Sequence, residues 1–503
     1  MHASILNDHV MKIKLISPKA HESTGYLLDF RYIAKLFGGV ARFGGIPPSI
    51  PTIAALTPND IEVIIVDENL EPIDYEEKVD LVGITAMTYL VPRAYEIANE
   101  FRKRGSFVVL GGIHASLLPE EAAQYADVVI VGEAEATWRE FIDDFRRGEN
   151  KKYYYSLKRP TLDNSPIPRW DLLDHKRYTG FLVQTTRGCP FNCDFCSSRA
   201  YLGEILRHKP IENIIKEIQF LKDLVGNKVI SFAADDNTCV DRQFAKKLFK
   251  ALIPLKIRWF CQTSINIAQD EELLELAAES GAVCFFVGLE SVSQDSLNSV
   301  NKGRLNRVED MARAIDKIHS YGIGVFGSFV FGFDHDDEHI FERTVKFIND
   351  TNIAFALFSV LTPFPGTRLF AKFEKEGRLL HKRWEKYDSA TVCFKPKLMS
   401  AQTLQDGFNW ALRNLYSYEA SFKRLQNLWS QGVWMRENVP LQVKGYLSFR
   451  MLKQLFRENK EMQRYILKSI ANLWKPHVNL GSILYNLSFH DYAYKLTRKI
   501  INN

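Results

Sequence analysis

The chain has 503 residues, which is too long for one compact core and favours about three domains. Hydrophobic residues make up 46% of it and charged residues 25%, a balance that excludes a chain disordered throughout. No apolar run reaches the roughly 18 residues of a membrane span, and the polar start is unlike a secretory signal. We therefore expect a cytoplasmic protein whose cysteines stay reduced and form no disulfide framework.

Short apolar strands alternate with longer amphipathic stretches in the first segment, residues 11–150. Such alternation predicts an α/β fold in which helices cover both faces of a parallel sheet. One of the expected helices spans Tyr95–Arg104. The predicted strands are Lys12–Ile16, Glu62–Val66, Leu81–Thr85, Phe107–Leu110 and Val128–Val131.

Polar residues and glycines gather where these strands end, at the edge where parallel sheets bind ligands. Glycine at such an edge lets the backbone approach a ligand closely. Ordinary turns use the same residue types, so the spacing alone leaves both interpretations open. The candidate ligand contacts are Asp67, Thr85, Gly111, Gly112, Gly132 and Glu133.

Residues 151–180 are polar and carry three prolines, a composition typical of a linker. Six strand and helix units follow in residues 181–370, which predicts a partial barrel with its chemistry at the C-terminal strand ends. Residues 371–503 are predicted to be mostly helical. The predicted barrel strands are Phe181–Thr185, Val229–Ala233, Arg258–Gln262, Val283–Gly288, Gly324–Phe331 and Ala356–Leu361.

Three cysteines, Cys189, Cys193 and Cys196, crowd into eight residues directly after the first barrel strand. Three thiolates so spaced can surround one face of an iron–sulfur cubane and leave one iron open, because no fourth cysteine lies nearby. A structural zinc site needs four protein ligands, usually as paired motifs. The other cysteines are scattered singly and suit packing as small hydrophobic residues. The pattern therefore favours an open [4Fe-4S] cluster over zinc.

With Phe195 before the last cysteine, this loop resembles that of the radical S-adenosylmethionine (SAM) superfamily. The resemblance implies a partial (β/α)6 TIM-type barrel, with the [4Fe-4S] cluster on the three cysteines as the metal site. It also implies that SAM binds the open iron and yields a 5′-deoxyadenosyl radical. The SAM contacts that it implies at the strand ends are Asp235, Asp236, Gln262, Ser264, Glu290, Ser291 and Gly332.

The glycine-rich motifs at 111–116 and 132–135 resemble the N-terminal cobalamin-binding-type domain found in many such enzymes. This resemblance implies a Rossmann-like (flavodoxin-like) fold for residues 11–150 and makes the six candidate contacts cobalamin contacts. The cobalt-ligating motif Asp-x-His-x-x-Gly is missing, since Asp67 is followed by Glu68 and Asn69. Radical relatives commonly bind cobalamin without it.

Residues 66–74, 332–337 and 394–400 resemble the hopanoid C-2 methylase-like group within this superfamily. The resemblance implies a cobalamin-dependent methyltransferase that acts on an unactivated carbon of a small-molecule substrate, lipid-like or otherwise hydrophobic. A reductant such as flavodoxin or ferredoxin would be a partner. Two alternatives stay open: radical chemistry without methylation, such as cyclisation, coupling or dehydrogenation, and a non-catalytic iron–sulfur or corrinoid carrier.

The net charge of +5 is unevenly distributed. Residues 440–503 contain 11 Lys or Arg against three acidic residues, so this tail alone carries +8 and the rest of the chain nets −3. Basic residues among tyrosines suit peripheral contact with an anionic membrane, although a solvated helical face would have the same composition. We expect no nucleic acid partner.

Overall fold

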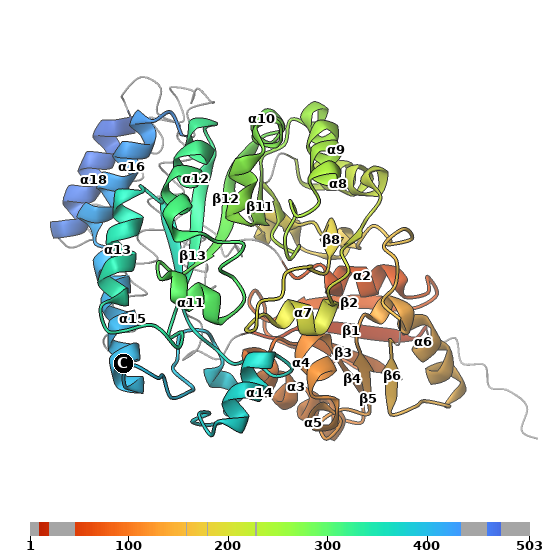
Figure 1. Cartoon of the computed structure of the whole chain (residues 1–503). Coiled ribbons are helices and arrows are strands. Elements are labelled where there is room, and N and C mark those ends of the chain that lie inside the picture. Colours follow the sequence, from red (N-terminus) through yellow and green to blue (C-terminus); the bar gives the residue numbers. More distant parts are fainter. Residues whose placement is uncertain are drawn as a thin grey trace, which may run out of the picture.

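In the computed structural model, the described residues are 10–19, 46–156, 158–178, 180–226, 229–433 and 460–473. They form two six-stranded parallel sheets, one after the other along the chain, and a group of helices after the second sheet (Figure 1). The predicted α/β class and the order of its three parts are confirmed.

The first sheet has the strand order β2-β1-β3-β4-β5-β6, and every pair is parallel. Five of its strands match the prediction to within one residue. The sixth, β6, lies in the range predicted as a linker, so the sheet extends five residues beyond the expected boundary at residue 150. The strands are β1 (Lys12–Ser17), β2 (Glu62–Asp67), β3 (Leu81–Thr85), β4 (Phe107–Gly111), β5 (Val128–Val131) and β6 (Tyr153–Tyr155).

Helices cover both faces of this sheet, as the alternation predicts. Trp138 and Phe141 of α6 pack with Ile50 of α2 on one face, while Ile97 and Phe101 of α3 pack on the other. The helices are α2 (Ser49–Leu56), α3 (Val91–Lys103), α4 (Gly112–Leu117), α5 (Pro119–Ala122) and α6 (Trp138–Arg147).

The second sheet is the predicted partial barrel, with the order β14-β13-β12-β11-β10-β7 and parallel pairing throughout. Its first strand is shorter than expected, because the backbone N–H of Thr185 donates to the Asp235 carboxylate. The strands are β7 (Gly180–Leu182), β10 (Val229–Phe232), β11 (Trp259–Thr263), β12 (Ala282–Glu290), β13 (Gly324–Phe331) and β14 (Phe355–Val360).

A helix follows each barrel strand, and small elements are inserted between them. β8 (Thr186–Arg187) and β9 (Arg207–His208) pair as a two-stranded antiparallel hairpin, and the three cysteines lie on the chain between them. The principal barrel helices are α8 (Ile211–Val225), α9 (Arg242–Leu252), α10 (Glu271–Glu279), α12 (Val308–Ser320), α13 (Ile340–Asp350) and α15 (Ala401–Leu415). The others are α7 (Ser197–Leu202), α11 (Gln294–Ser299), α14 (Arg368–Lys375), α16 (Tyr418–Ser430) and α18 (Lys460–Leu473).

The C-terminal region is helical where it is described. Most of the basic tail, 440–503, lies outside the described residues, and α18 is its described part. Among the helices that the structure describes, none combines the length and the apolar character that a bilayer crossing requires.

Candidate active site

The carboxyl ends of the two sheets face each other, so the loops that follow their strands meet. The Tyr178 hydroxyl, just before β7, donates to Asp67 Oδ2 at the end of β2 over 3.2 Å. The Tyr201 hydroxyl of α7 donates to the Gly132 carbonyl after β5 over 3.2 Å. These contacts place the loops after β2 and β5 of the first sheet against the barrel domain.

Residues 188–196, here called the cysteine loop, lie at this junction. Gly188 begins the loop with φ of +87°, and a Cβ on it would lie 2.4 Å from the Ile205 carbonyl oxygen. Its backbone N–H donates to Asp236 Oδ2 over 3.1 Å, and the Cys189 N–H donates to the Gly203 carbonyl over 3.1 Å. Only glycine fits this turn, which brings the first cysteine against the hairpin.

The outer side of the cysteine loop is bound to the last third of the barrel. Asp194 Oδ1 lies 2.6 Å from Arg368 Nη2 and accepts from Asn301 Nδ2 over 3.0 Å. The Phe195 ring packs 6.0 Å from the Phe333 ring, centroid to centroid. The protein therefore holds the cysteine loop at its beginning, through Asp236 and Gly203, and near its end, through Arg368 and Asn301.

The three cysteines provide a donor set that fits an open iron–sulfur cluster. All three are free thiols. Burial raises the pKa of Cys189 to about 11, with additional effects of Cys196 and Asp236, so these thiols need cationic iron to become thiolates. Across the described ranges, no three His, Cys, Asp or Glu side chains are grouped to bind one metal ion. In an open cubane, each of the three cysteines would bind a different iron.

Glu290 and Lys302 form a buried ion pair beside the cysteines. Lys302 Nζ lies 3.2 Å from Glu290 Oε1. Burial opposes the charged form of Lys302, but Glu290 and the neighbouring Cys193 outweigh it and raise the pKa of the lysine. Glu290 has φ of +68°, and such strain in a residue other than glycine is typical of functional sites. The pair therefore places opposite charges beside Cys193.

Asp235, expected to contact SAM, instead shapes the backbone under the cysteine loop. Its carboxylate accepts the backbone N–H groups of Thr185 and Thr186 over 2.6 and 2.9 Å. It also accepts the hydroxyls of Thr185 and Thr238. Four donors satisfy both oxygens, and burial raises the pKa of this carboxyl to about 6. Its neighbour Asp236 is the residue that bonds the cysteine loop directly.

The remaining predicted SAM contacts lie at the carboxyl ends of β11, β12 and β13. Ser264 accepts from Asn237 Nδ2, and the Oδ1 atom of that asparagine is buried with no hydrogen-bond partner among the described residues. Gly332 has φ of +105°, and its N–H donates to Asp336 Oδ2 over 2.9 Å. Gln262 lies in β11, one residue before the strand ends, and Ser291 follows Glu290 at the end of β12.

On the first sheet, Thr85, Gly111 and Gly112 form a closely packed backbone edge. Gly112 has φ of +87°, and a Cβ there would lie 2.3 Å from Thr85 Oγ1. Gly132 has φ of +90°, and a Cβ on it would lie 3.0 Å from Ser156 Cβ. The glycines leave the half-buried backbone at the ends of β4 and β5 without side chains, which fits a large flat cofactor that packs on this edge.

Glu133 has a partner that sequence reasoning missed. Its carboxylate lies 2.7 Å from Arg187 Nη1 and 2.7 Å from Arg207 Nη2, while Glu135 pairs with Arg187 Nη2 at 2.5 Å. The exposed fractions are 3% for Glu133 and 12% for each arginine. We call these four residues the Glu–Arg cluster. Glu133, expected to contact cobalamin, therefore connects the first domain to the hairpin that carries the cysteines.

His114, from the motif at 111–116, is fully buried and does not point into the junction. Its Nε2 lies 3.3 Å from Glu121 Oε1, and the same carboxylate accepts from Trp384 Nε1 over 2.9 Å. Asp67 is also engaged, since its Oδ1 accepts from Asn69 Nδ2 over 2.8 Å. Both residues thus have structural contacts in the protein.

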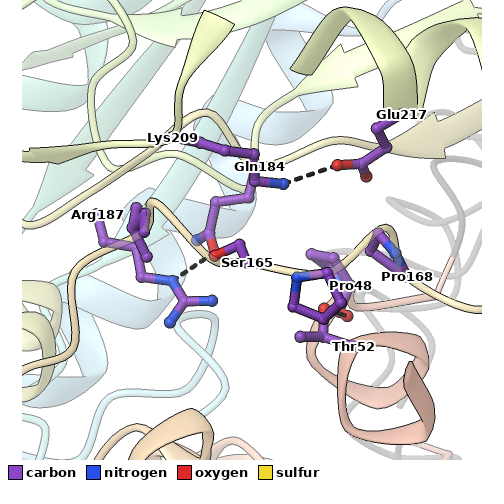
Figure 2. Close-up of a pocket in the computed structure, with 10 residues that line it drawn as sticks. Pro48, Thr52, Ser165, Pro168, Gln184, Arg187, Lys209 and Glu217 are labelled. Carbon is purple, nitrogen blue, oxygen red and sulfur yellow. Dashed lines mark hydrogen bonds and ion pairs between the residues drawn. The ribbon is translucent and has the colours of Figure 1, made fainter. Parts of the chain in front are cut away.

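Figure 2 shows a recess beside Arg187, lined by residues from both domains. Pro48 and Thr52 of the first domain lie opposite Gln184, which accepts from Arg187 Nε over 2.6 Å. Lys209 and Glu217 form an ion pair of 2.7 Å on its far side. The recess lies between the two domains, and no cysteine lines it. Arg187 is held by Gln184 at this recess and by Glu133 of the first domain.

Together, the facing sheets and the three-cysteine loop define a radical SAM enzyme with an N-terminal B12-binding domain. The radical SAM superfamily model matches residues 183–348, and the B12 binding domain matches residues 35–142. A domain of unknown function matches residues 367–475. The predicted cofactors are thereby confirmed: a [4Fe-4S] cluster, SAM and cobalamin.

The chain belongs to the family of B12-binding radical SAM methyltransferases. It is 32% identical over 397 residues to bacteriochlorophyllide d C-12(1)-methyltransferase of Chlorobaculum tepidum, covering 77% of this chain and 86% of that protein. The hopanoid C-2 methylase of Rhodopseudomonas palustris is 27% identical over 383 residues, covering 74% and 71%.

A solved structure confirms the fold. The radical S-adenosylmethionine methyltransferase TsrM from Kitasatospora setae, solved with cobalamin and a [4Fe-4S] cluster, superposes with a TM-score of 0.61 at 15% identity. The match covers 92% of this chain and all of that one. The order of a B12-binding sheet followed by a partial barrel is thus common to both chains.

Proposed function

We propose that this enzyme transfers a methyl group to an unactivated carbon of a hydrophobic small molecule. The observation that carries the proposal is the Glu–Arg cluster, which joins the B12-binding edge to the hairpin around the cysteines. A methyl group bound at one cofactor can meet a radical generated at the other only when the two sites face one confined space.

Each part of this arrangement has its own task. Cys189, Cys193 and Cys196 would bind the cluster, while Glu290 and Lys302 would orient the charged methionine end of SAM beside it. When bound, the cofactors supply the radical that removes hydrogen from carbon and the methyl group that replaces it. Asp235 and Asp236 are positioning residues, since Asp235 fixes the backbone just before the cysteine loop and Asp236 accepts from the loop itself.

The substrate class rests on the relatives. The two curated relatives described above modify a bacteriochlorophyllide and a hopanoid, which are both large, mostly hydrophobic ring systems. We infer that this chain takes a hydrophobic, lipid-like or ring-containing molecule. The basic tail would favour contact of the enzyme with an anionic membrane surface, where such a substrate collects.

The test uses enzyme prepared and reduced without oxygen, SAM with a deuterated methyl group, and hydrophobic extracts. We expect a product heavier by one labelled methyl group, together with 5′-deoxyadenosine. A product without the label would favour cyclisation, coupling or dehydrogenation, and the absence of 5′-deoxyadenosine would favour a carrier. The variant Cys193→Ala controls for chemistry that does not depend on the cluster, and Cys284→Ala is its matched control outside the cysteine loop.

Membrane contact has a separate test. Flotation with acidic vesicles should recover the full chain at low salt and lose it at high salt, because the attraction is electrostatic. A chain truncated at residue 440 that floats equally well would show that the tail is not responsible.

A further inference from the structure

The chain between α11 and α12 is bonded to the cysteine loop. The backbone N–H of Asp194 donates to the Val300 carbonyl over 3.2 Å, and the Asp194 carboxylate accepts from Asn301 Nδ2 over 3.0 Å. Asn301 has φ of +60°, a left-handed conformation that asparagine adopts more readily than most residues. Lys302 follows directly, and Asp194 is the neighbour of Cys193. These bonds therefore bring Lys302 to the cysteines from a distant part of the sequence.

The Lys302 side chain ends in a buried ion pair at the end of β12. Its Nζ lies 3.2 Å from Glu290 Oε1, and the exposed fractions of the two side chains are 12% and 9%. Gly288 leaves the space for this pair, since a Cβ there would lie 2.4 Å from Glu290 Oε1 and 3.5 Å from Lys302 Nζ. Charges so shielded from water act on their neighbours more strongly than surface charges do.

Of the two charges, the ammonium has the larger effect on Cys193. Burial raises the pKa of the Cys193 thiol; Lys302 opposes this rise, and Glu290 adds to it by less than Lys302 lowers it. Burial also opposes the charged form of Lys302, but Glu290, Cys193 and Cys196 outweigh it and raise the pKa of the lysine. Lys302 therefore stays charged, and its positive charge dominates the field of the pair at Cys193.

A charge at this position bears on the reduction of the cluster. A [4Fe-4S] cluster gains one negative charge when it takes up an electron, and its reduction potential depends on the charges, hydrogen bonds and solvent around it. A fixed cation beside one of the thiolates stabilises the reduced form, and a fixed carboxylate destabilises it. The share of enzyme with a reduced cluster therefore depends on Lys302 and Glu290.

We propose that the Lys302–Glu290 pair sets the reduction potential of the cluster: Lys302 raises this potential, and Glu290 lowers it. The cluster takes one electron from its reductant, and neither side chain gains or loses a proton or a bond. The inference rests on the cluster and its cysteines, and it holds whether or not the enzyme transfers a methyl group.

The experiment measures the potential of the cluster in the anaerobically reconstituted full chain without SAM. The EPR signal of the reduced cluster is recorded at a series of fixed potentials, and iron content is measured for every variant. The test variants are Lys302→Met, Glu290→Gln and the charge-preserving Lys302→Arg. The matched controls, Lys209→Met and Glu217→Gln, break a buried ion pair of 2.7 Å with exposed fractions of 8% and 1%, beside a recess that no cysteine lines.

We expect Lys302→Met to shift the equilibrium at least about tenfold towards the oxidised cluster, which lowers the one-electron potential by about 59 mV or more. Glu290→Gln should shift it in the opposite direction, because Lys302 then acts without a counter-charge. Lys302→Arg and both controls should keep the wild-type potential. Loosened packing would move the potentials of Lys302→Met and Glu290→Gln in the same direction, so opposite shifts identify an effect of charge.

Equal potentials in Lys302→Met and the wild type would overturn the proposal, as would shifts of the same sign in Lys302→Met and Glu290→Gln. A shift in Lys302→Arg as large as that in Lys302→Met would assign the effect to packing and not to charge. If Lys302→Met retained no iron, Glu290→Gln would decide alone, since only a more positive potential in that variant supports the proposal. Because SAM and substrate are absent, an error in the proposed methyl transfer leaves the readout unchanged.

Discussion

Replacing Glu133 by Gln removes one charge from the buried Glu–Arg cluster and leaves Arg187 and Arg207 with one carboxylate between them. Three contacts of 2.7 to 2.9 Å are weakened, from Glu133 to the two arginines. Breaking a buried ion pair from one side typically costs about 3 to 5 kcal/mol, because the remaining charge stays out of water. At about 1.4 kcal/mol for each factor of ten, the junction should open at least a hundredfold more often.

Hydrogen exchange measured by mass spectrometry, on peptides that contain residues 132–135 and 186–189, reports this opening. The matched control is Glu149→Gln, since Glu149 is 65% exposed, pairs with Arg147 and should contribute less than about 1 kcal/mol. In the double variant Glu133→Gln/Arg207→Gln the charges balance again, so part of the loss should be recovered. If exchange in Glu133→Gln matched that in Glu149→Gln, the cluster would be an ordinary solvated network and our reasoning would be refuted.

Cys189→Ala should lose the cluster absorbance and iron after anaerobic reconstitution while Cys284→Ala retains both, and an unchanged cluster in the first variant would contradict the ligand assignment. Gly112→Ala should lose corrinoid on purification, because its Cβ would lie 2.3 Å from Thr85 Oγ1, whereas Gly148→Ala meets no atom within 4 Å and should retain it. Burial lowers the pKa of His319 from 6.5 to about 4. The unfolded chain therefore binds the proton first, and the free energy of unfolding falls by about 3 kcal/mol as the pH drops from about 6.5 to 4. Urea unfolding of His319→Leu should show a flatter pH dependence, and a slope identical to that of the wild type would contradict this prediction.

The sequence predicted the strands of both sheets well because buried parallel strands are continuous apolar runs bounded by turn residues. The cluster cysteines could be predicted equally well, since their motif is contained in eight consecutive residues. β6 was missed because Tyr153–Tyr155 is only three residues long and lies in a proline-bearing region. Its strand character comes from pairing with β5 and not from its own pattern.

The site residues that sequence reasoning missed or misjudged depend on contacts between distant segments. Lys302 lies on the chain after α11, and its position beside Glu290 follows from the path of that loop. Glu133 and Arg187 are 54 residues apart, and the motif that contains Glu133 gave no indication of its partner. Asp235 was placed at the correct strand end, but three of its four donors come from Thr185 and Thr186, some 50 residues earlier in the chain. Spacing predicts where a residue lies along a strand; its partners are set by tertiary packing.

The location of the Glu–Arg cluster has a consequence for engineering by domain exchange. Two of its charges belong to the N-terminal domain and two to the barrel, so neither half is electrically neutral at the junction when it is alone. A chimera that receives its B12-binding domain from a relative must also receive the matching β8–β9 hairpin. Without it, two carboxylates or two guanidinium groups would be desolvated with no counter-charge.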